Sequence, residues 1–308
     1  MRRFGFWAAL GLAGRARAAG EHPLLERLAA RRRGLDDGTH GAFDGAASRV
    51  ALPFGASSEL DLSYGGDPAQ RLDVYRPAAA QAAAVILYVH GGGWVRGDKA
   101  MPQMVQNKLP HWLWLGCIVV STNYRILPAA GVLEQADDVA RALAFVQRNA
   151  GGWGGDGGRV VLVGHSAGAH LAALVAADPA IGARQGVAAW RATLALDSAA
   201  LDMVAIMSRR HYHFYDPVFG ADPGFWREAS PTHRLQAGPA APMLLVCSSL
   251  REDSAPPARE FAAKATALGG RVTVHEVALS HRDINDQLGL PGAYTQAVDV
   301  FLKTVGVP

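Results

Sequence analysis

Apolar residues gather, after residue 58, into short and nearly continuous runs of four or five residues. Runs of this length are typical of strands that are buried on both faces, and such strands predict a mostly parallel sheet. Five runs have this character: Val85–Val89, Cys117–Val120, Val160–Val163, Thr193–Leu196 and Met243–Cys247.

Three further segments alternate apolar and polar residues, as half-exposed strands do. Glu59–Tyr64 and Leu72–Tyr75 are separated by the turn cluster Gly65-Gly66-Asp67-Pro68, which predicts an antiparallel pair at the start of the sheet. Val272–Val277 is the last strand of the series. The pattern therefore predicts eight strands, of which the first two are antiparallel.

Helical periodicity fills the connections between these strands. Leu133–Asn149 places apolar residues three and four positions apart, and residues 167–177, 258–268 and 294–304 are similar. Strands that alternate with helices predict an α/β fold with crossover connections. Residues 198–242 are too long for a plain crossover, and their aromatic residues favour either a small lid over a site or a peripheral pair of helices.

Composition narrows the class of protein. With 308 residues, 50% apolar and 19% charged, the chain can bury a large core, which excludes a disordered protein. Residues 1–33 hold eight arginines and two glutamates, whereas the rest holds 22 basic and 25 acidic residues. The body lacks a basic face, so we expect no nucleic-acid partner. Cys117 and Cys247 lie in apolar runs and are expected to be buried thiols.

The N-terminal segment has the pattern of an export signal. Arg2 and Arg3 precede the apolar stretch Phe4–Gly14, and Ala16-Arg17-Ala18 matches a small-residue cleavage site. The stretch is shorter than the about 20 residues that span a bilayer, so we expect no stable membrane insertion. Cleavage near residue 19 would give a periplasmic or secreted protein. The alternative is an uncleaved extension on a cytoplasmic protein. Either way, residues 1–58 form an N-terminal extension and residues 59–308 the expected catalytic domain.

A candidate nucleophile stands between a predicted strand and a predicted helix. Gly164-His165-Ser166-Ala167-Gly168 has the G-x-S-x-G pattern in the strand–turn–helix setting of a nucleophile elbow. Such a turn exposes the serine hydroxyl above the sheet, and the N–H groups at the start of the helix face the reacting centre. Ser166 is therefore the predicted nucleophile, and the alternative is a tight turn capped by this serine.

A glycine-rich loop follows another predicted strand as His90-Gly91-Gly92-Gly93-Trp94. Backbone N–H groups can stabilise a tetrahedral oxyanion where glycines let the chain approach closely, and the N–H of the residue after the nucleophile, Ala167, completes such a site. The alternatives are a flexible loop or a phosphate cradle. A cradle requires Gly-Lys-Ser/Thr, and Lys99 lies outside any such pattern.

From about Leu60 to the C-terminus, the chain resembles α/β-hydrolases of the hormone-sensitive-lipase and bacterial carboxylesterase type. The segment Gly97-Asp98-Lys99 is more similar to that of small secreted esterases and arylformamidase-like enzymes than to that of the large lipases. The resemblance implies an α/β-hydrolase fold in which Gly92 and Gly93 supply N–H groups together with Ala167. It rests on His90–Gly93, Asn123-Tyr124-Arg125, Gly164–Gly168 and Ser280-His281.

In this fold the catalytic residues follow the order serine, acid, histidine. Of the 11 histidines, only His275 and His281 follow Met243–Cys247, and His275 lies inside a predicted strand, so His281 is the expected base. The acid is expected in the loop after Met243–Cys247, where the candidates are Glu252 and Asp253. Asp253 fits the family pattern better, as an aspartate shortly before the next helix, and Glu252 is the alternative.

His211 and His213, with Asp216 nearby, raise the question of a metal site. Their spacing of two fits a helical ligand pair poorly and no cysteine joins them, which favours a surface or lid role. No dinucleotide motif or metal signature stands elsewhere, so we expect neither a cofactor nor a metal.

Together these residues predict acyl transfer to water through an acyl-enzyme. We expect a carboxylesterase that acts on small-molecule esters with small or medium acyl groups. An arylformamidase, which cleaves a formyl amide, is the first alternative. The second alternative is a non-catalytic binding protein that has a hydrolase fold. The presence of Ser166, His281 and an acid counts against this alternative.

Overall fold

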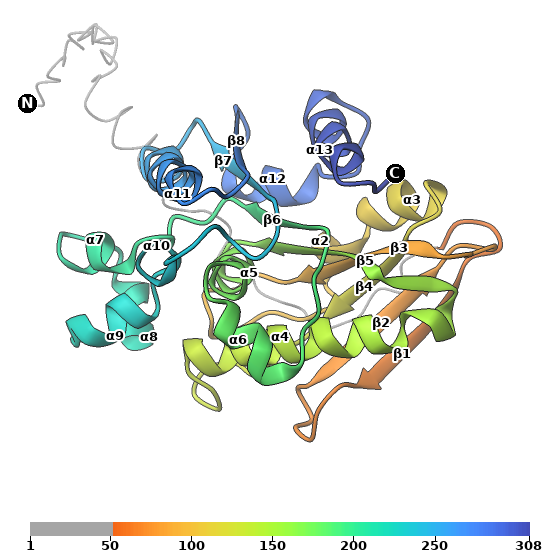
Figure 1. Ribbon diagram of the computed structural model, residues 1–308, viewed down its shortest axis with the longest axis horizontal. Helices are drawn as coiled ribbons and strands as arrows, with labels where there is room; N and C mark the ends of the chain where they lie inside the picture. Colours follow the sequence, from red (N-terminus) through yellow and green to blue (C-terminus); the bar gives the residue numbers. More distant parts are fainter. Residues whose placement is uncertain (1–51) are drawn as a thin grey trace, which may run out of the picture. The chain divides into compact units, whose positions relative to one another are not determined.

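One sheet runs through residues 52–308, the part of the chain that the computed structural model describes (Figure 1). Its strands are β1 (Ser57–Ser63), β2 (Arg71–Arg76), β3 (Ala83–Val89), β4 (Ile118–Thr122), β5 (Gly155–His165), β6 (Ala192–Leu196), β7 (Met243–Ser248) and β8 (Val272–Val277). They lie in the order β1-β2-β4-β3-β5-β6-β7-β8. β2 is antiparallel to both of its neighbours, and all other pairs are parallel. The predicted eight-stranded, mostly parallel sheet is confirmed, together with its antiparallel start.

Alternate residues of the central strands face two hydrophobic cores, one on each side of the sheet. In β3, Val85, Leu87 and Val89 belong to the first core, whereas Ile86 and Tyr88 belong to the second. Both faces of the strand are covered, which explains why its sequence is continuously apolar. The first core includes residues of α4 (Val132–Asn149), α5 (Ala167–Ala177), α6 (Pro179–Gln185) and α11 (Ala255–Ala267). The second includes residues of α2 (Pro102–Val105), α3 (Lys108–Trp114), α12 (His281–Asp286) and α13 (Ala293–Thr304).

The four helices that the periodicity predicts are present, with small shifts at their ends. α11 begins at Ala255 instead of Ala258, because Pro256 and Pro257 occupy its first turn, where proline is tolerated. The sequence did not indicate α2, α3, α6 or α12, none of which exceeds seven residues. Helices of one or two turns are too short to show a recognisable period.

The long connection of residues 198–242 folds into several short helical segments. They are α7 (Met203–Met207), a 3-10 turn (His213–Tyr215), α8 (Asp216–Phe219), α9 (Pro223–Glu228) and α10 (Pro231–Arg234). Asp202 and Asp222 cap α7 and α9, since their carboxylates accept the N–H groups of Ala205 and Gly224 at 2.9 and 2.8 Å. A lid function for this insertion stays a prediction.

Among residues 52–308, the first strand begins at Ser57. The expected domain bounds stay a prediction. The expected signal segment, residues 1–19, lies outside the described residues.

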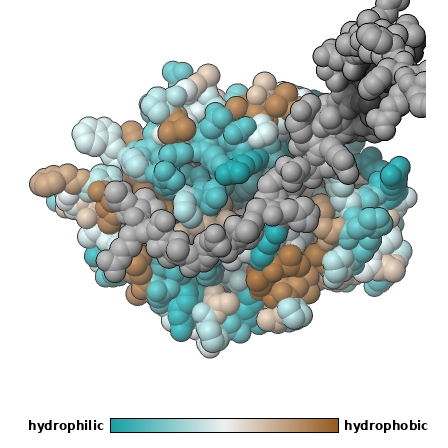
Figure 2. All heavy atoms as spheres, turned by 180° about the vertical axis from the view of Figure 1, so that it is seen from behind, coloured by the Kyte–Doolittle hydropathy of each residue, from teal (hydrophilic) through white to brown (hydrophobic). Residues whose placement is uncertain are grey.

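Apolar side chains also reach the surface in separate parts of the fold. Phe54, Trp114 and Val300 are among the large exposed ones. Figure 2 shows hydrophobic patches between larger hydrophilic areas on one face of the molecule. Within residues 52–308, no helix combines the length and apolar character needed to cross a membrane.

α12, which begins with His281, is held at its far end by two buried side chains. The hydroxyl of Tyr88 donates to Asn285 Oδ1 at 2.6 Å, and Lys108 Nζ donates to the Asn285 carbonyl at 2.6 Å. Lys108 Nζ also donates to the Gln103 carbonyl at 2.9 Å and lies 5.1 Å from the centre of the Tyr88 ring. Burial lowers the pKa of Lys108 to about 7, although the charge of Asp286 opposes the shift.

We expect Lys108→Met to change how stability depends on pH. The folded-state pKa of Lys108 is about 7, below the about 10.4 of an unfolded lysine. Between these values the unfolded chain binds the extra proton, so wild-type stability should rise with pH by up to about 1.4 kcal/mol per unit. Methionine does not titrate, so the variant should lack this rise. Urea unfolding at pH 7.5, 8.5 and 9.5 measures both slopes, and equal slopes would contradict the expectation.

Candidate active site

Ser166 sits on a strained turn between β5 and α5. Its φ of 56° and ψ of −119° lie in a region that residues other than glycine rarely adopt. The Ser166 N–H donates to the Leu196 carbonyl at the end of β6, at 2.9 Å, and the Ser166 carbonyl accepts the His170 N–H at 3.1 Å. The turn is therefore anchored to a neighbouring strand on one side and continues into a helix on the other, as the sequence motif predicts.

The glycines on either side of Ser166 are required by backbone contacts. A Cβ atom on Gly164 would lie 2.2 Å from the Gly168 carbonyl oxygen, and one on Gly168 would lie 2.3 Å from the Val89 carbonyl oxygen. Both distances join backbone atoms, so no side-chain rearrangement relieves them. This close packing of β5, α5 and β3 explains the spacing of the two glycines.

The glycine-rich loop after β3 lies beside this turn. A Cβ atom on Gly91 would come within 3.0 Å of the Ser166 Cβ, which places the loop against the serine. Gly92 has a φ of +127°, and its carbonyl accepts the Val95 and Arg96 N–H groups at 3.3 and 3.2 Å, so the chain turns back on itself. Within residues 52–308, no acceptor takes the N–H groups of Gly92 or Gly93. These two N–H groups therefore have no described acceptor.

Residues of two other motifs hold the loop in place. The His90 ring stacks on Tyr124 with 4.4 Å between ring centres, and the Tyr124 hydroxyl donates to the His90 carbonyl at 3.0 Å. Asn123 Oδ1 accepts the Lys99 N–H at 2.6 Å. A Cβ atom on Gly97 would lie 2.2 Å from His90 Nδ1. The segments around Gly97 and Tyr124 thus form the support of the glycine-rich loop.

His281 is the first residue of α12, and its carboxylate partner is Asp197. Nδ1 of His281 lies 2.6 Å from Oδ2 of Asp197, which directly follows β6. The side chains of both residues are buried. The sequence predicted His281 in the loop after β8, whereas it is the first residue of α12. The sequence did not indicate this aspartate.

The carboxylate that the structure brings to His281 belongs neither to Asp253, the expected acid, nor to Glu252, its alternative. The carboxylate of Asp253 contacts Arg251 Nε and Nη2 at 3.1 and 3.2 Å instead of His281. Glu252, the alternative, is exposed. Because β6 and β7 are neighbouring parallel strands, their carboxyl ends open at the same edge, and a carboxylate after either strand can reach the histidine. An aspartate immediately after the apolar run of β6 was the available signal.

Four donors surround the Asp197 carboxylate. Oδ1 accepts the Ser248 N–H at 2.9 Å and the Ser254 hydroxyl, and Oδ2 accepts Arg251 Nη1 at 2.8 Å besides His281. Burial alone raises the pKa of Asp197, but the hydrogen bond and charge of His281, the charge of Arg251 and the Ser254 hydroxyl outweigh it. The pKa therefore lies well below its usual value and the carboxylate stays ionised. The backbone of Asp197 has a φ of 52°, a left-handed conformation that aspartate tolerates better than most residues.

The contacts of His281 determine which ring nitrogen carries the proton. Arg251 Nη1 lies 2.8 Å from Nδ1 of His281, but a guanidinium only donates hydrogen bonds. Nδ1 also lies 2.6 Å from a carboxylate oxygen, which only accepts. Protonated Nδ1 satisfies Asp197, while Arg251 donates to the same oxygen. The neutral imidazole therefore keeps Nε2 as its unprotonated, basic nitrogen.

The two histidines next to the turn have partners of their own. Nε2 of His165 donates a hydrogen bond to the His281 carbonyl at 2.9 Å. The centres of the two rings are 4.5 Å apart. Burial, followed by the nearby charge of His281, lowers the pKa of His165 well below its ordinary value. His165 is therefore neutral and contacts the backbone of the catalytic candidate.

His170 connects the glycine-rich loop to the insertion of residues 198–242. Trp94 Nε1 donates to His170 Nδ1 at 3.1 Å, and His170 Nε2 donates to the Ala229 carbonyl at 2.7 Å. Burial lowers the pKa of His170 to about 4, so the ring stays neutral and can accept from Trp94. The Trp94 ring packs against Phe219 and Tyr215 of the insertion, with ring centres 5.0 and 5.9 Å away.

His211 and His213 contact Asp216 on the surface of the insertion. The nitrogen–oxygen distances are 2.9 Å for His211 and 3.2 Å for His213. In the part of the chain that the structure describes, no group of three or more His, Cys, Asp or Glu side chains is arranged to hold a metal ion.

Parts of the chain are similar to known esterases in sequence. Residues 72–184 match the family model BD-FAE. The chain is 33% identical over 141 residues to a probable isoprenylcysteine alpha-carbonyl methylesterase of Arabidopsis thaliana, an alignment that covers 45% of this chain and 33% of the relative. It is 36% identical over 169 residues to esterase LipQ of Mycobacterium tuberculosis, which covers 52% of this chain and 38% of that protein. The chain thus spans less than half the length of either curated relative.

Solved structures of esterases share the fold over most of the chain. Esterase B from Lactobacillus rhamnosis has a TM-score of 0.66 at 18% identity, covering 92% of this chain and 93% of its own. A truncated carbohydrate esterase from gut microbiota has a TM-score of 0.67 at 18% identity, covering 80% of this chain and 95% of its own. These likenesses confirm the fold that the sequence resemblance implied.

Proposed function

We propose that this protein, an α/β-hydrolase by its fold, is a serine hydrolase that cleaves carboxylic esters. Ser166 is the nucleophile, His281 the general base and Asp197 the acid in this proposal. The observation that carries it is the hydrogen bond of 2.6 Å between His281 Nδ1 and Asp197, next to a serine on a strained elbow. Similarity to proteins named as esterases supports the reaction class.

In the proposed mechanism, Nε2 of His281 takes the hydroxyl proton of Ser166 as the oxygen attacks the ester carbonyl. Asp197 keeps the second nitrogen protonated and stabilises the positive imidazole that forms. His281 then gives its proton to the leaving alcohol. Water attacks the acyl-enzyme by the same route, and the serine is restored.

The negative oxygen of the tetrahedral intermediate needs donors that are already in place. We propose the N–H groups of Gly92, Gly93 and Ala167 for this task. Ala167 is the first residue of α5, so its N–H has no partner inside the helix. In enzymes of known mechanism, one such donor contributes about 3 kcal/mol to the transition state.

The acyl group of the substrate is expected to be small or medium in length. Tyr215 and Phe219 are buried against Trp94, so the insertion fills space beside the glycine-rich loop with aromatic rings. The insertion also carries Arg209 and Arg210, whose charges are costly to bury against an acyl chain. Both features favour a compact site over an extended apolar trough.

Ser166→Ala should abolish turnover, because the nucleophile is lost. In such sites this loss costs on the order of 10⁶ in kcat. Hydrolysis of p-nitrophenyl butyrate and covalent labelling by a fluorophosphonate measure the effect, and Ser63→Ala on the exposed side of β1 is the matched control. A Ser166 variant that keeps more than a few per cent of activity would contradict the assignment. Parallel assays with N-formylkynurenine test the formamidase alternative.

Asp197→Asn should lower kcat by about 10⁴, because an amide can hold the imidazole in the wrong tautomer, as in the well-studied serine proteases. Asp253→Asn should have a much smaller effect on kcat at the pH optimum, since its carboxylate contacts Arg251 and not the imidazole. Comparing kcat of the two variants decides the acid. A dead Asp253 variant beside an active Asp197 variant would reverse the assignment.

Activity should peak with short acyl chains and fall steeply with long ones. Each methylene contributes about 0.8 kcal/mol only while the pocket has room to bury it. A series of p-nitrophenyl esters from acetate to palmitate measures kcat/KM along the chain length. A kcat/KM that keeps rising beyond octanoate would show that the site is open-ended.

A further inference from the structure

We propose that Arg251 and Asp253 form a charge-balancing pair that sets how readily His281 takes up a proton. Arg251 is a positioning residue in this proposal, because it acts through Asp197 and the imidazole and not on the substrate. The inference rests on the proposed function, since it describes the base of the same site.

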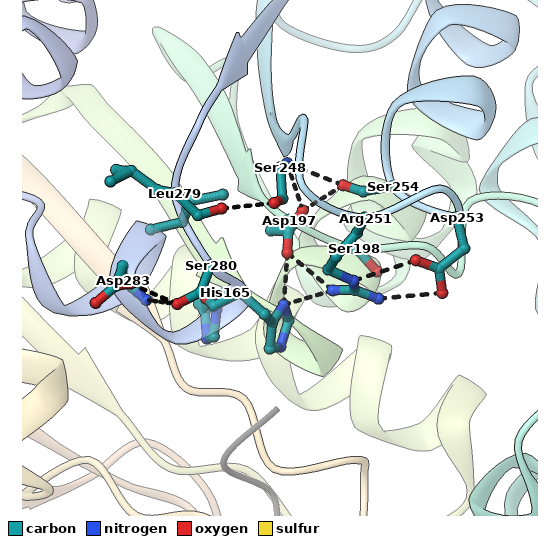
Figure 3. A network of polar contacts seen from close by, with 12 residues as sticks. His165, Asp197, Ser198, Ser248, Arg251, Asp253, Ser254, Leu279, Ser280 and Asp283 are labelled. Carbon is teal, nitrogen blue, oxygen red and sulfur yellow. Dashed lines mark hydrogen bonds and ion pairs between the residues drawn. The ribbon is translucent and has the colours of Figure 1, made fainter. Parts of the chain in front are cut away.

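The guanidinium of Arg251 lies between two carboxylates (Figure 3). On one side, Nη1 donates to Asp197 Oδ2 at 2.8 Å and lies 2.8 Å from His281 Nδ1. On the other side, Nε and Nη2 donate to the two oxygens of Asp253 at 3.1 and 3.2 Å. The side chain of Arg251 is only 16% exposed, so water screens these charges weakly.

Arg251 stays positively charged in this position. Burial alone lowers its pKa, but the charges of Asp197 and Asp253 raise it above the ordinary value. The fork of a guanidinium matches a carboxylate with two parallel hydrogen bonds, which fixes the orientation of the group. Asp253 therefore holds the fork in place, and the remaining nitrogen reaches the catalytic candidates.

The position of this cation has two opposite effects. It helps to keep Asp197 ionised, which favours a protonated imidazole, and it repels the positive imidazole directly, which disfavours one. The direct repulsion acts between Arg251 Nη1 and His281 Nδ1, which are 2.8 Å apart, whereas the first effect reaches the imidazole only through Asp197. The direct repulsion is therefore the larger effect. Asp253 offsets part of it with its negative charge. The basicity of His281 thus depends on three neighbouring charges, of which only Asp197 touches the imidazole as a hydrogen-bond acceptor.

Other titratable groups near His281 are neutral or paired elsewhere. His165 faces the ring from β5 and is kept neutral by burial. On α12, Asp283 accepts from Ser280 at 2.6 Å, and Arg282 is paired with Asp286 at 2.9 Å.

Groups on more distant elements complete the surroundings. Lys108 on α3 lies near the far end of α12, Tyr294 on α13 lies near enough to Asp197 to feel its charge, and Tyr215 of the insertion interacts with Arg251. Between residues 52 and 308, Asp197 and Arg251 are the charged side chains in contact with Nδ1.

The test removes each charge of the pair in turn. Arg251→Met removes the repulsion of a positive imidazole, so the acid limb of kcat/KM should move up by about one pH unit, in line with the effect of a close charge. Asp253→Asn leaves the guanidinium uncompensated and should move the same limb down. Arg251→Lys keeps the charge, so its limb should lie closer to wild type than that of Arg251→Met. Arg282→Met, which removes an exposed cation next to His281 in sequence, is the control and should leave the limb in place.

NMR titration of the His281 imidazole provides a second readout that does not require turnover, and His281→Gln assigns its signal. Opposite shifts in the Arg251→Met and Asp253→Asn proteins support the proposal. Shifts in the same direction, or reduced activity with an unchanged His281 titration in either variant, overturn it and leave the pair a structural brace. If Arg251→Met does not fold, Asp253→Asn and Arg251→Lys still decide the sign.

The two proposals fail separately. A wild-type protein that neither hydrolyses esters nor reacts with a fluorophosphonate contradicts the proposed function. The NMR shifts would still decide whether the pair controls the protonation of His281.

Discussion

The hydrogen bond between Asp197 and His281 constrains the rest of the site. A buried carboxylate is stable only when its oxygens have donors, and Asp197 has four of them. Three come from the end of β7 and the loop that follows it, and the fourth comes from the start of α12. Both segments must therefore dock on the end of β6. Lys108 and Tyr88 contact Asn285 near the other end of α12, so the helix that carries the imidazole is held at both ends.

The strand end that carries Asp197 also holds the turn of Ser166, the proposed nucleophile. The Ser166 N–H bonds to the carbonyl of Leu196, the residue before Asp197. The glycine-rich loop approaches the same turn from β3, and Trp94 links it through His170 to the insertion. A rigid sheet therefore brings together groups that are far apart in the sequence, and short polar links keep the loops in register with it.

In our proposal, the loop after β7 supports the catalytic acid instead of supplying it. It was expected to deliver the acid, but its residues Ser254 and Arg251 donate to a carboxylate that comes from β6. Asp253, the expected acid, neutralises Arg251 on the side away from Asp197. In our proposal this exchange adds a cation beside the catalytic base, together with the anion that moderates it.

The sequence by itself determined the strands, the longer helices and the positions of Ser166, the glycine-rich loop and His281. These features follow from local patterns, since the runs around Val85–Val89 report burial on both faces and the elbow motif is contiguous. The residue that we propose as the acid was indicated only by the tertiary structure. Asp197 and His281 are 84 residues apart. They meet because β6, β7 and β8 are neighbouring parallel strands, and Asp197 follows β6 while His281 follows β8. No local period encodes which strand ends adjoin, and none shows that Arg251 occupies the carboxylate of Asp253.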